Sequence, residues 1–496
     1  MRNRVSRRLL LSSALSALAS AAVANAPLTS LRPSLRPDGG ARRRSSGAET
    51  LIQQAQLGGD VSYAVADVQS GILLEASSAK AGLPPASVTK VLTALYALDV
   101  LGENFRFETR LVATGPVENG VIKGDLILVG GGDPELDTIA LAEMASKLKA
   151  TGVTKVEGKL RGWGGALPFI PAIDTEQPDQ VGYNPAISAL NLNFNRVHFE
   201  WTRAGSNYNV TMEARTKGFR PAVRSSRMRV ENRKGPVFVY KDEGDHDSWS
   251  VARKALGARG SRWLPVRKPE RYAAEVFARL ATLQGIELTL GTARKAAPGG
   301  TILVRHQSAP LADILRGMLR FSTNLTAEVV GMYATLKSTG RPTGLKNSAQ
   351  EMSRWAVQAL GVPGADFVDH SGLGAASRMS ASGMAAILAK VHSDGRLKPI
   401  LKRFDLRNEQ GGIDRNHPVK VAAKTGTLYF VSALAGYATG PDKQELAFAI
   451  FTANEKLRAQ VDTKNDTRPR GASSWNRRSR RLQQKLIERW VNLYRS

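Results

Sequence analysis

A short stretch, Ser87-Val88-Thr89-Lys90, constrains the fold of this chain most strongly, because it lies between a helix breaker and a strong helix former. Pro84-Pro85 does not fit inside a helix, whereas the run from Val91 to Leu98 has apolar residues at three- and four-residue spacing. Ser87 is therefore predicted at a helix N-terminus. Residues three apart share a helix face, so the Lys90 amine is expected beside the Ser87 hydroxyl, where it can act as a base.

The Ser-x-x-Lys motif alone does not establish a site. Ser77 to Lys80 and Ser146 to Lys149 fit the same pattern, and a capped or solvated helix explains each of them. Two later motifs set Ser87 apart. Ser322-Thr323-Asn324 falls in a break between two predicted helices, and Lys424-Thr425-Gly426-Thr427 follows an alternating strand pattern.

These residue types together suit acyl transfer. Ser87 is expected to attack a carbonyl, while Lys90, Ser322 and Lys424 move protons between the nucleophile and the leaving amine. Two converging lysines lower each other's pKa. Gly426 has no side chain, so a substrate backbone is expected to lie along this strand. The backbone N–H groups of Ser87 and Thr427 are candidates for an oxyanion hole.

The three motifs, in this order, resemble those of the D-alanyl-D-alanine carboxypeptidase/endopeptidases among the low-molecular-mass penicillin-binding proteins. Ser322 follows Ser87 by 235 residues (322 − 87), which is similar to the group with a large insert between the first two motifs. Further stretches resemble the family: Gly124 to Pro134, Tyr183-Asn184, Ser188 to Asn193, His306 to Leu311 and Asp369 to Leu373.

The resemblance implies an exported serine D-Ala-D-Ala carboxypeptidase and D,D-endopeptidase that acts on peptidoglycan stem peptides and binds β-lactam antibiotics. It implies that Asn324 holds the substrate amide and that Thr425 and Thr427 approach its terminal carboxylate. Two positions depart from the family pattern, where Thr323 replaces Asp and His370 replaces Gly. A β-lactamase-like hydrolase and a non-catalytic cell-wall polymer-binding protein remain alternatives, and no cofactor or metal is expected.

The predicted fold class is α/β (α+β), an antiparallel sheet with helices on both faces and a large β-rich insert; the family resemblance implies five strands. Residues 48–104 and 301–496 are expected to form a split catalytic domain, and residues 105–300 the insert, whose removal is expected to spare chemistry on small substrates. Local patterns predict a helix over Ala48 to Gln56, a strand over Ala189 to Asn195, and a three-stranded meander from Val419 to Ala453.

The N-terminus indicates export. Residues 1–26 have a basic start, an apolar stretch and small residues before Pro27, as in a signal peptide, and Arg7-Arg8 suggests the twin-arginine route. Residues 27–47 are predicted to be a linker. A periplasmic or cell-envelope location follows, and the absence of cysteine excludes disulfides and thiolate chemistry.

The net charge of +27 favours a polyanionic partner. For an exported protein, an anionic cell-wall or membrane surface is expected and nucleic acid is not. Basic residues concentrate between Arg215 and Lys234 and between Arg468 and Arg495, although either cluster also fits a solvated face.

Overall fold

The computed structural model describes residues 47–362, 364–408 and 410–495, which lie in one compact unit. The predicted signal peptide and the predicted linker up to residue 46 lie outside these residues. Within the described part of the chain, we find no helix with the combined length and apolar character that a membrane span requires.

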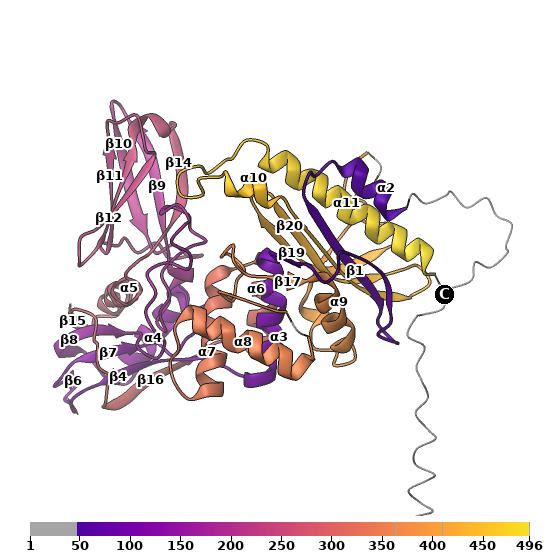
Figure 1. The fold of residues 1–496 in the computed structure, drawn as a ribbon. Helices are drawn as coiled ribbons and strands as arrows, with labels where there is room; N and C mark the ends of the chain where they lie inside the picture. The colour runs from indigo at the N-terminus through magenta and orange to yellow at the C-terminus, as the bar shows by residue number, and fades with distance from the viewer. Residues whose placement is uncertain (1–46, 363, 409, 496) are drawn as a thin grey trace, which may run out of the picture. The chain divides into compact units, whose positions relative to one another are not determined.

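A six-stranded antiparallel sheet combines strands from residues 60–77 with strands from residues 402–453 (Figure 1). Its first strand in sequence pairs with its last, with Ala64 opposite Ala449. The predicted meander is confirmed, and one short strand, β18, makes six where the family resemblance implied five. In spatial order the strands are β18 Lys402–Phe404, β19 Lys420–Leu428, β20 Val431–Thr439, β21 Glu445–Ala453, β1 Asp60–Asp67 and β2 Leu73–Ser77.

Helices cover both faces of this sheet, as predicted (Figure 1). Side chains alternate along each strand, so Ala433 and Ala435 face one helical layer while Leu434 faces the other. Small residues on the first face leave room for several helices. One layer contains α2 Ala48–Ala55 and α11 Ala472–Leu493; the other contains α3 Thr89–Leu101, α6 Leu311–Phe321, α7 Asn324–Thr339, α8 Leu345–Leu360 and α9 Ala381–Lys390.

The segment between α3 and α6 forms three further sheets with α4 Thr138–Ala150 and α5 Pro269–Leu283, which confirms a β-rich insert. The seven-stranded sheet contains β16 Thr301–Gln307, β4 Glu108–Ala113, β7 Leu126–Val129, β8 Lys155–Trp163, β6 Val121–Ile122, β5 Val117–Glu118 and β15 Glu287–Leu290. The other two contain β10 Asn207–Glu213, β9 Arg196–Ala204 and β14 Arg259–Pro265, and β11 Ser226–Glu231, β13 Asp247–Ala252 and β12 Phe238–Asp242.

The pairing of β16 bears on where the insert ends. β16 begins at Thr301, the expected start of the second catalytic segment, yet it pairs with β4. We therefore propose that the insert ends after Gln307. The remaining elements are β3 Gly82–Leu83 paired with β17 Met379–Ser380, and the short helix α10 Glu455–Ala459.

The predicted strand over Ala189 to Asn195 is wrong. Its last three residues, Asn193, Phe194 and Asn195, have φ angles of 52°, 58° and 49° and form a tight helical turn. Asparagine side chains stabilise it locally, since Asn195 Oδ1 accepts from the backbone N–H of Leu192 at 3.0 Å. The alternating leucines that suggested a strand, Leu190 and Leu192, are buried in the core of the insert, and in this segment only an isolated bridge from Leu190 to Asp133 forms.

Candidate active site

Ser87 lies in a short 3₁₀ turn, Ala86–Val88, that leads directly into α3. This is the helix start that the sequence predicted. Two glycines pack against the turn: a Cβ on Gly372 would lie 1.8 Å from the Ala86 carbonyl oxygen, and one on Gly426 would lie 3.0 Å from Ser87 N. The backbone around Ser87 is thus held between the loop of Gly372 and strand β19.

Lys90 has no exposed surface and donates to three acceptors. Its Nζ lies 3.2 Å from Ser87 Oγ, 2.8 Å from Asn324 Oδ1 and 2.7 Å from the carbonyl oxygen of Ser371. Burial lowers the pKa of Lys90 to about 8, although nearby carboxyl groups act in the opposite direction. An amine beside a serine hydroxyl with such a pKa is suited to accept the hydroxyl proton.

A second serine–lysine pair faces the first. Lys424 Nζ lies 2.9 Å from Ser322 Oγ and 2.7 Å from the carbonyl oxygen of Thr425. Ser322 occupies the break between α6 and α7 with a left-handed φ of 59°. Burial, followed by the positive charge of Lys90, holds the pKa of Lys424 well below its usual range.

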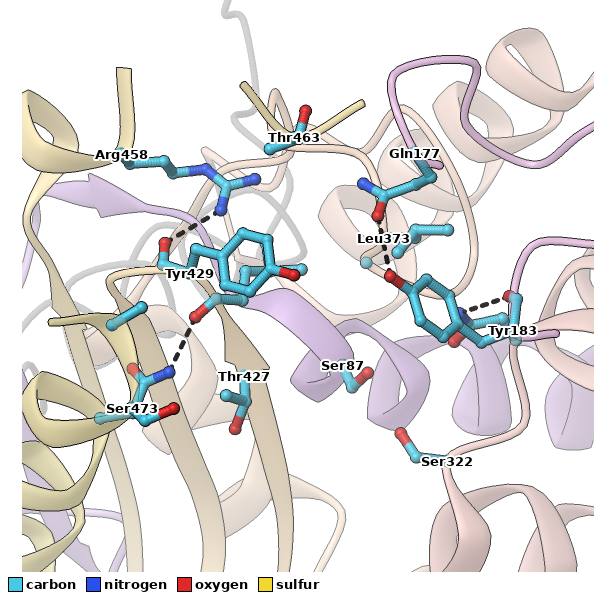
Figure 2. Close-up of a pocket in the computed structure, with 15 residues that line it drawn as sticks. Ser87, Gln177, Tyr183, Ser322, Leu373, Thr427, Tyr429, Arg458, Thr463 and Ser473 are labelled. Carbon is cyan, nitrogen blue, oxygen red and sulfur yellow. Dashed lines mark hydrogen bonds between the residues drawn. The ribbon is translucent and has the colours of Figure 1, made fainter. Parts of the chain in front are cut away.

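The two pairs border a cavity of about 400 Å³ (Figure 2). Of the predicted site residues, Ser87, Ser322, Asn324 and Thr427 line it, and Lys90 and Lys424 are buried beneath. Thr425 and Gly426 lie outside the lining. The other lining residues are Gln177, Tyr183, Gly372, Leu373, Leu428, Tyr429, Arg458, Thr463, Ala472, Ser473 and Asn476.

The structure shows a close approach of backbone at Gly426 in addition to the predicted room for a substrate. A Cβ there would lie 2.6 Å from the Pro85 carbonyl oxygen, inside contact distance. The glycine therefore lets β19 approach the turn that carries Ser87, so the protein's own backbone occupies the space that a side chain would fill.

The insert contributes residues to the pocket, which bears on the prediction that its removal spares chemistry on small substrates. Tyr183 and Gln177 line the cavity, and the Tyr183 hydroxyl donates to Gln177 Oε1 at 3.1 Å (Figure 2). Asn324 Nδ2 donates to the Tyr183 carbonyl oxygen at 3.0 Å. Removing the insert would therefore leave the Asn324 amide without this partner.

Sequence reasoning missed Glu328, a buried carboxyl group behind Lys90. Glu328 Oε2 accepts from His370 N at 2.8 Å and Oε1 accepts from Ser371 N at 3.0 Å. Its position four residues after Asn324 was an available signal, because i and i+4 share a helix face. Asp369, beside it, accepts from Gly372 N and Gly374 N at 2.6 Å each.

His370, at a position where the family pattern has glycine, is accommodated by a glycine elsewhere. A Cβ on Gly331 of α7 would lie 2.3 Å from the His370 ring. The ring is fully buried, and its Nε2 lies 2.8 Å from Ser348 Oγ. Burial lowers the pKa of His370 to about 3, so the ring is neutral and has a packing role.

Neither the alternative motif on α4 nor the loop before β13, which has carboxyl groups around His246, joins this site. Ser146 is exposed on α4 and does not line the cavity. In the loop before β13, His246 Nδ1 lies 2.6 Å from Asp245 Oδ1. Among the residues that the structure describes, no group of three or more histidine and carboxyl side chains is arranged to hold a metal ion.

Comparison with known proteins gives consistent matches over most of the chain. A model of the D-Ala-D-Ala carboxypeptidase 3 (S13) family matches residues 46–471. The D-alanyl-D-alanine carboxypeptidase DacB of Haemophilus influenzae is 24% identical and aligns over 81% of this chain and 87% of its own. The D-alanyl-D-alanine carboxypeptidase of Actinomadura sp. (strain R39) is 28% identical over 86% and 84%.

The fold is also similar to a solved structure. The crystal structure of penicillin binding protein 4 (dacB) from Haemophilus influenzae superimposes with a TM-score of 0.72 at 19% identity, and the match covers 89% of this chain and 99% of that one. The same protein complexed with a β-lactam gives a TM-score of 0.69.

Proposed function

This chain belongs to the D-Ala-D-Ala carboxypeptidase 3 (S13) family and is a serine carboxypeptidase, and from that premise we propose that Ser87 is its nucleophile. One observation carries this assignment. Lys90 and Lys424, both buried, donate to Ser87 and Ser322, and both serines line one cavity. Neither alternative Ser-x-x-Lys motif has residues in that lining.

In the proposed acylation, Ser87 Oγ attacks the carbonyl carbon of the penultimate D-alanine. The hydroxyl proton moves to Lys90, which is neutral in roughly a tenth of the molecules at pH 7 for a pKa of about 8. The C–O bond forms, the C–N bond breaks, and the departing amine takes a proton from the Ser322–Lys424 pair, which regains one from the Lys90 ammonium, so that Lys90 is neutral again. In deacylation, water attacks the ester carbon, the bond from that carbon to Ser87 Oγ breaks, one water proton passes through Lys90 to Ser87 Oγ, and the remaining hydroxyl stays on the released acid.

The edge of β19 suits a peptide substrate. β18 pairs with Val421–Ala423 only, so in the described sheet β19 has no outer neighbour along the rest of its length. A stem peptide is proposed to add as a further strand there, with Asn324 at its amide and Thr425 and Thr427 near its terminal carboxylate. The N–H groups of Ser87 and Thr427 are proposed as the oxyanion hole.

Penicillin binding and cross-link cleavage belong to the same proposal. A β-lactam has a strained acyl carbonyl next to a carboxylate. The D-Ala-D-Ala end of a stem peptide has a planar acyl carbonyl next to a carboxylate. Penicillin is therefore proposed to acylate Ser87 durably and the peptide to acylate it transiently. A β-lactamase-like activity differs in rapid deacylation, and hydrolysis of benzylpenicillin discriminates the two. Turnover of a stem pentapeptide and of a cross-linked muropeptide dimer measures the carboxypeptidase and D,D-endopeptidase activities.

Labelling tests the nucleophile. Incubation with labelled penicillin and peptide mass mapping is expected to place the label on Ser87, and Ser87→Ala is expected to lose it. Ser146→Ala, the matched control on α4, is expected to label as the wild type does. Label on Ser146, or equal labelling of the Ser87→Ala protein, would contradict the assignment.

We further propose a cell-envelope location and an anionic surface as a partner, either cell-wall polymer or membrane. The N-terminal pattern of residues 1–26 supports export. N-terminal sequencing of the envelope protein is expected to begin after the first twenty-odd residues, and a start at Met1 would refute it. The outer face of α11 carries four exposed basic residues that form no ion pair within the described residues: Arg477, Arg480, Arg481 and Lys485.

A further inference from the structure

The carboxyl group of Glu328 and the amine of Lys90 contact the same residue from opposite sides. Ser371 donates its N–H to Glu328 Oε1 at 3.0 Å, and its carbonyl oxygen accepts from Lys90 Nζ at 2.7 Å. Glu328 also accepts from His370 N, so both of its oxygens hold this turn. Through the Ser371 carbonyl oxygen, this turn holds Lys90 beside Ser87.

We propose that Glu328 is a positioning residue for Lys90: it fixes the turn against which the amine lies, and its negative charge stabilises the ammonium that forms when Lys90 takes the Ser87 proton. This inference rests on the proposed function of Lys90 as the base. The role is comparable to that of the aspartate behind the histidine in a catalytic triad, which orients the base and stabilises its charged form.

The charge of Glu328 acts strongly on the Lys90 amine because both groups are buried. Lys90 and Glu328 have no exposed surface, and Asp369 is 2% exposed. In such a site water screens charges weakly. Burial, followed by the charge of Asp369, raises the pKa of Glu328 to about 8, whereas the N–H groups of Ser371 and His370 and the charge of Lys90 favour its carboxylate, so Glu328 and Lys90 titrate over the same pH range. The charged groups that act on the pKa of Lys90 are Glu328 from α7 and Asp369 from the 369–374 turn, and Lys90 in turn lowers the pKa of Lys424 on β19. The two carboxyl groups favour the ammonium of Lys90, and burial disfavours it.

A purely structural role is the competing explanation, since Asp369 holds the same turn through Gly372 N and Gly374 N. The two roles differ in what they predict for pH. A structural residue changes stability and the amount of active protein, and leaves the pKa of the base unchanged. A residue that stabilises the ammonium moves that pKa.

The test is Glu328→Gln, which keeps the shape and removes the charge. Ser87 labelling of the wild type is established first, so failure of the proposed function is recognised separately. The rate of penicillin acylation is then measured from pH 5 to 10. Loss of the charge lowers the pKa of Lys90, so the midpoint of the rising acidic limb is expected to fall by about one pH unit or more, with a plateau about tenfold lower because the base is weaker.

A matched control exists in the insert. Glu275 is a buried glutamate whose two oxygens accept from Arg224 N at 2.7 Å and Ser225 N at 2.8 Å, and it does not line the cavity. Glu275→Gln loses the same kind of backbone contact and is expected to leave the acidic limb where the wild type has it.

A conservative variant covers the case in which the Gln protein does not fold. Glu328→Asp keeps the charge but moves it one methylene away, so its acidic limb is expected to shift downward by less than that of Glu328→Gln. An acidic limb that stays at the wild-type pH in the folded Gln variant, or in the Asp variant if only that one folds, would overturn the proposal. A shift of equal size in Glu275→Gln would also overturn it.

Discussion

The amine of Lys90 lies 2.8 Å from Asn324 Oδ1, although 234 positions separate the two residues. Asn324 in turn donates to the Tyr183 carbonyl oxygen of the insert. Residues from the first motif, the second motif and the insert therefore meet in one hydrogen-bonded group. The position of the base depends on all three segments.

Lys90→Ala is expected to reduce acylation of Ser87 by several orders of magnitude, because the hydroxyl then lacks a proton acceptor. The rate of labelling by penicillin measures this effect, and circular dichroism checks that the variant is folded. Lys149→Ala removes the lysine of the alternative motif on α4 and is expected to label at the wild-type rate. Rapid labelling of a folded Lys90→Ala protein would contradict the role of the base.

The acylation rate of the wild-type enzyme is expected to rise with pH through a midpoint near 8. Burial lowers the pKa of Lys90 to about 8, and only its neutral form accepts the proton, so activity is low below this pH and increases above it. Stopped-flow measurement of acylation across pH 5 to 10 gives the midpoint. A rate independent of pH between 6 and 9 would show that another group acts as the base.

Gly426→Ala is expected to lower acylation by about a hundredfold, because a Cβ would lie 2.6 Å from the Pro85 carbonyl oxygen and push β19 away from Ser87. Penicillin labelling and peptide turnover measure the loss. Gly257→Ala is the matched control, since a Cβ there meets nothing within 4 Å. Equal activity of the two variants would contradict the close approach.

Gly331→Ala is expected to lower the free energy of unfolding by about 1–3 kcal/mol, because a Cβ would lie 2.3 Å from the buried His370 ring. Combining it with His370→Gly removes the clash, so the two changes should be non-additive by about 1 kcal/mol or more. Urea unfolding of the two single variants and the double variant gives the coupling energy. If the effects of the two changes on the free energy of unfolding simply add, the His370 ring is not the reason for glycine at position 331.

Replacing Arg477, Arg480, Arg481 and Lys485 by Gln is expected to weaken binding to phosphatidylglycerol vesicles by at least about a hundredfold, since each basic residue contributes about 1 kcal/mol near an anionic surface. Sedimentation at two salt concentrations measures binding, and phosphatidylcholine vesicles give the neutral reference. The matched control replaces four exposed basic residues of the insert that lie outside both basic clusters: Lys159, Lys254, Arg259 and Arg279. An equal loss in that control would assign the effect to net charge and contradict a surface on α11.

The sequence by itself determined the local structure around the nucleophile. Two prolines before an apolar helix place Ser87 at a helix start, and its three-residue spacing from Lys90 places the amine beside the hydroxyl, since i and i+3 share a face. The alternation after Lys420 likewise predicted the meander. These features depend on neighbours a few positions apart, which is the range over which sequence patterns report structure.

Only the tertiary structure decided what lies behind and around those residues. The contacts of Glu328 with Ser371, of Gly426 with Pro85 and of Tyr183 with Asn324 join segments that no local pattern relates. The wrong strand prediction before Arg196 also reflects the tertiary structure. Its alternating leucines are buried against other elements of the insert, while asparagine side chains stabilise a turn there. Packing between distant segments sets such contacts, and packing depends on the whole fold.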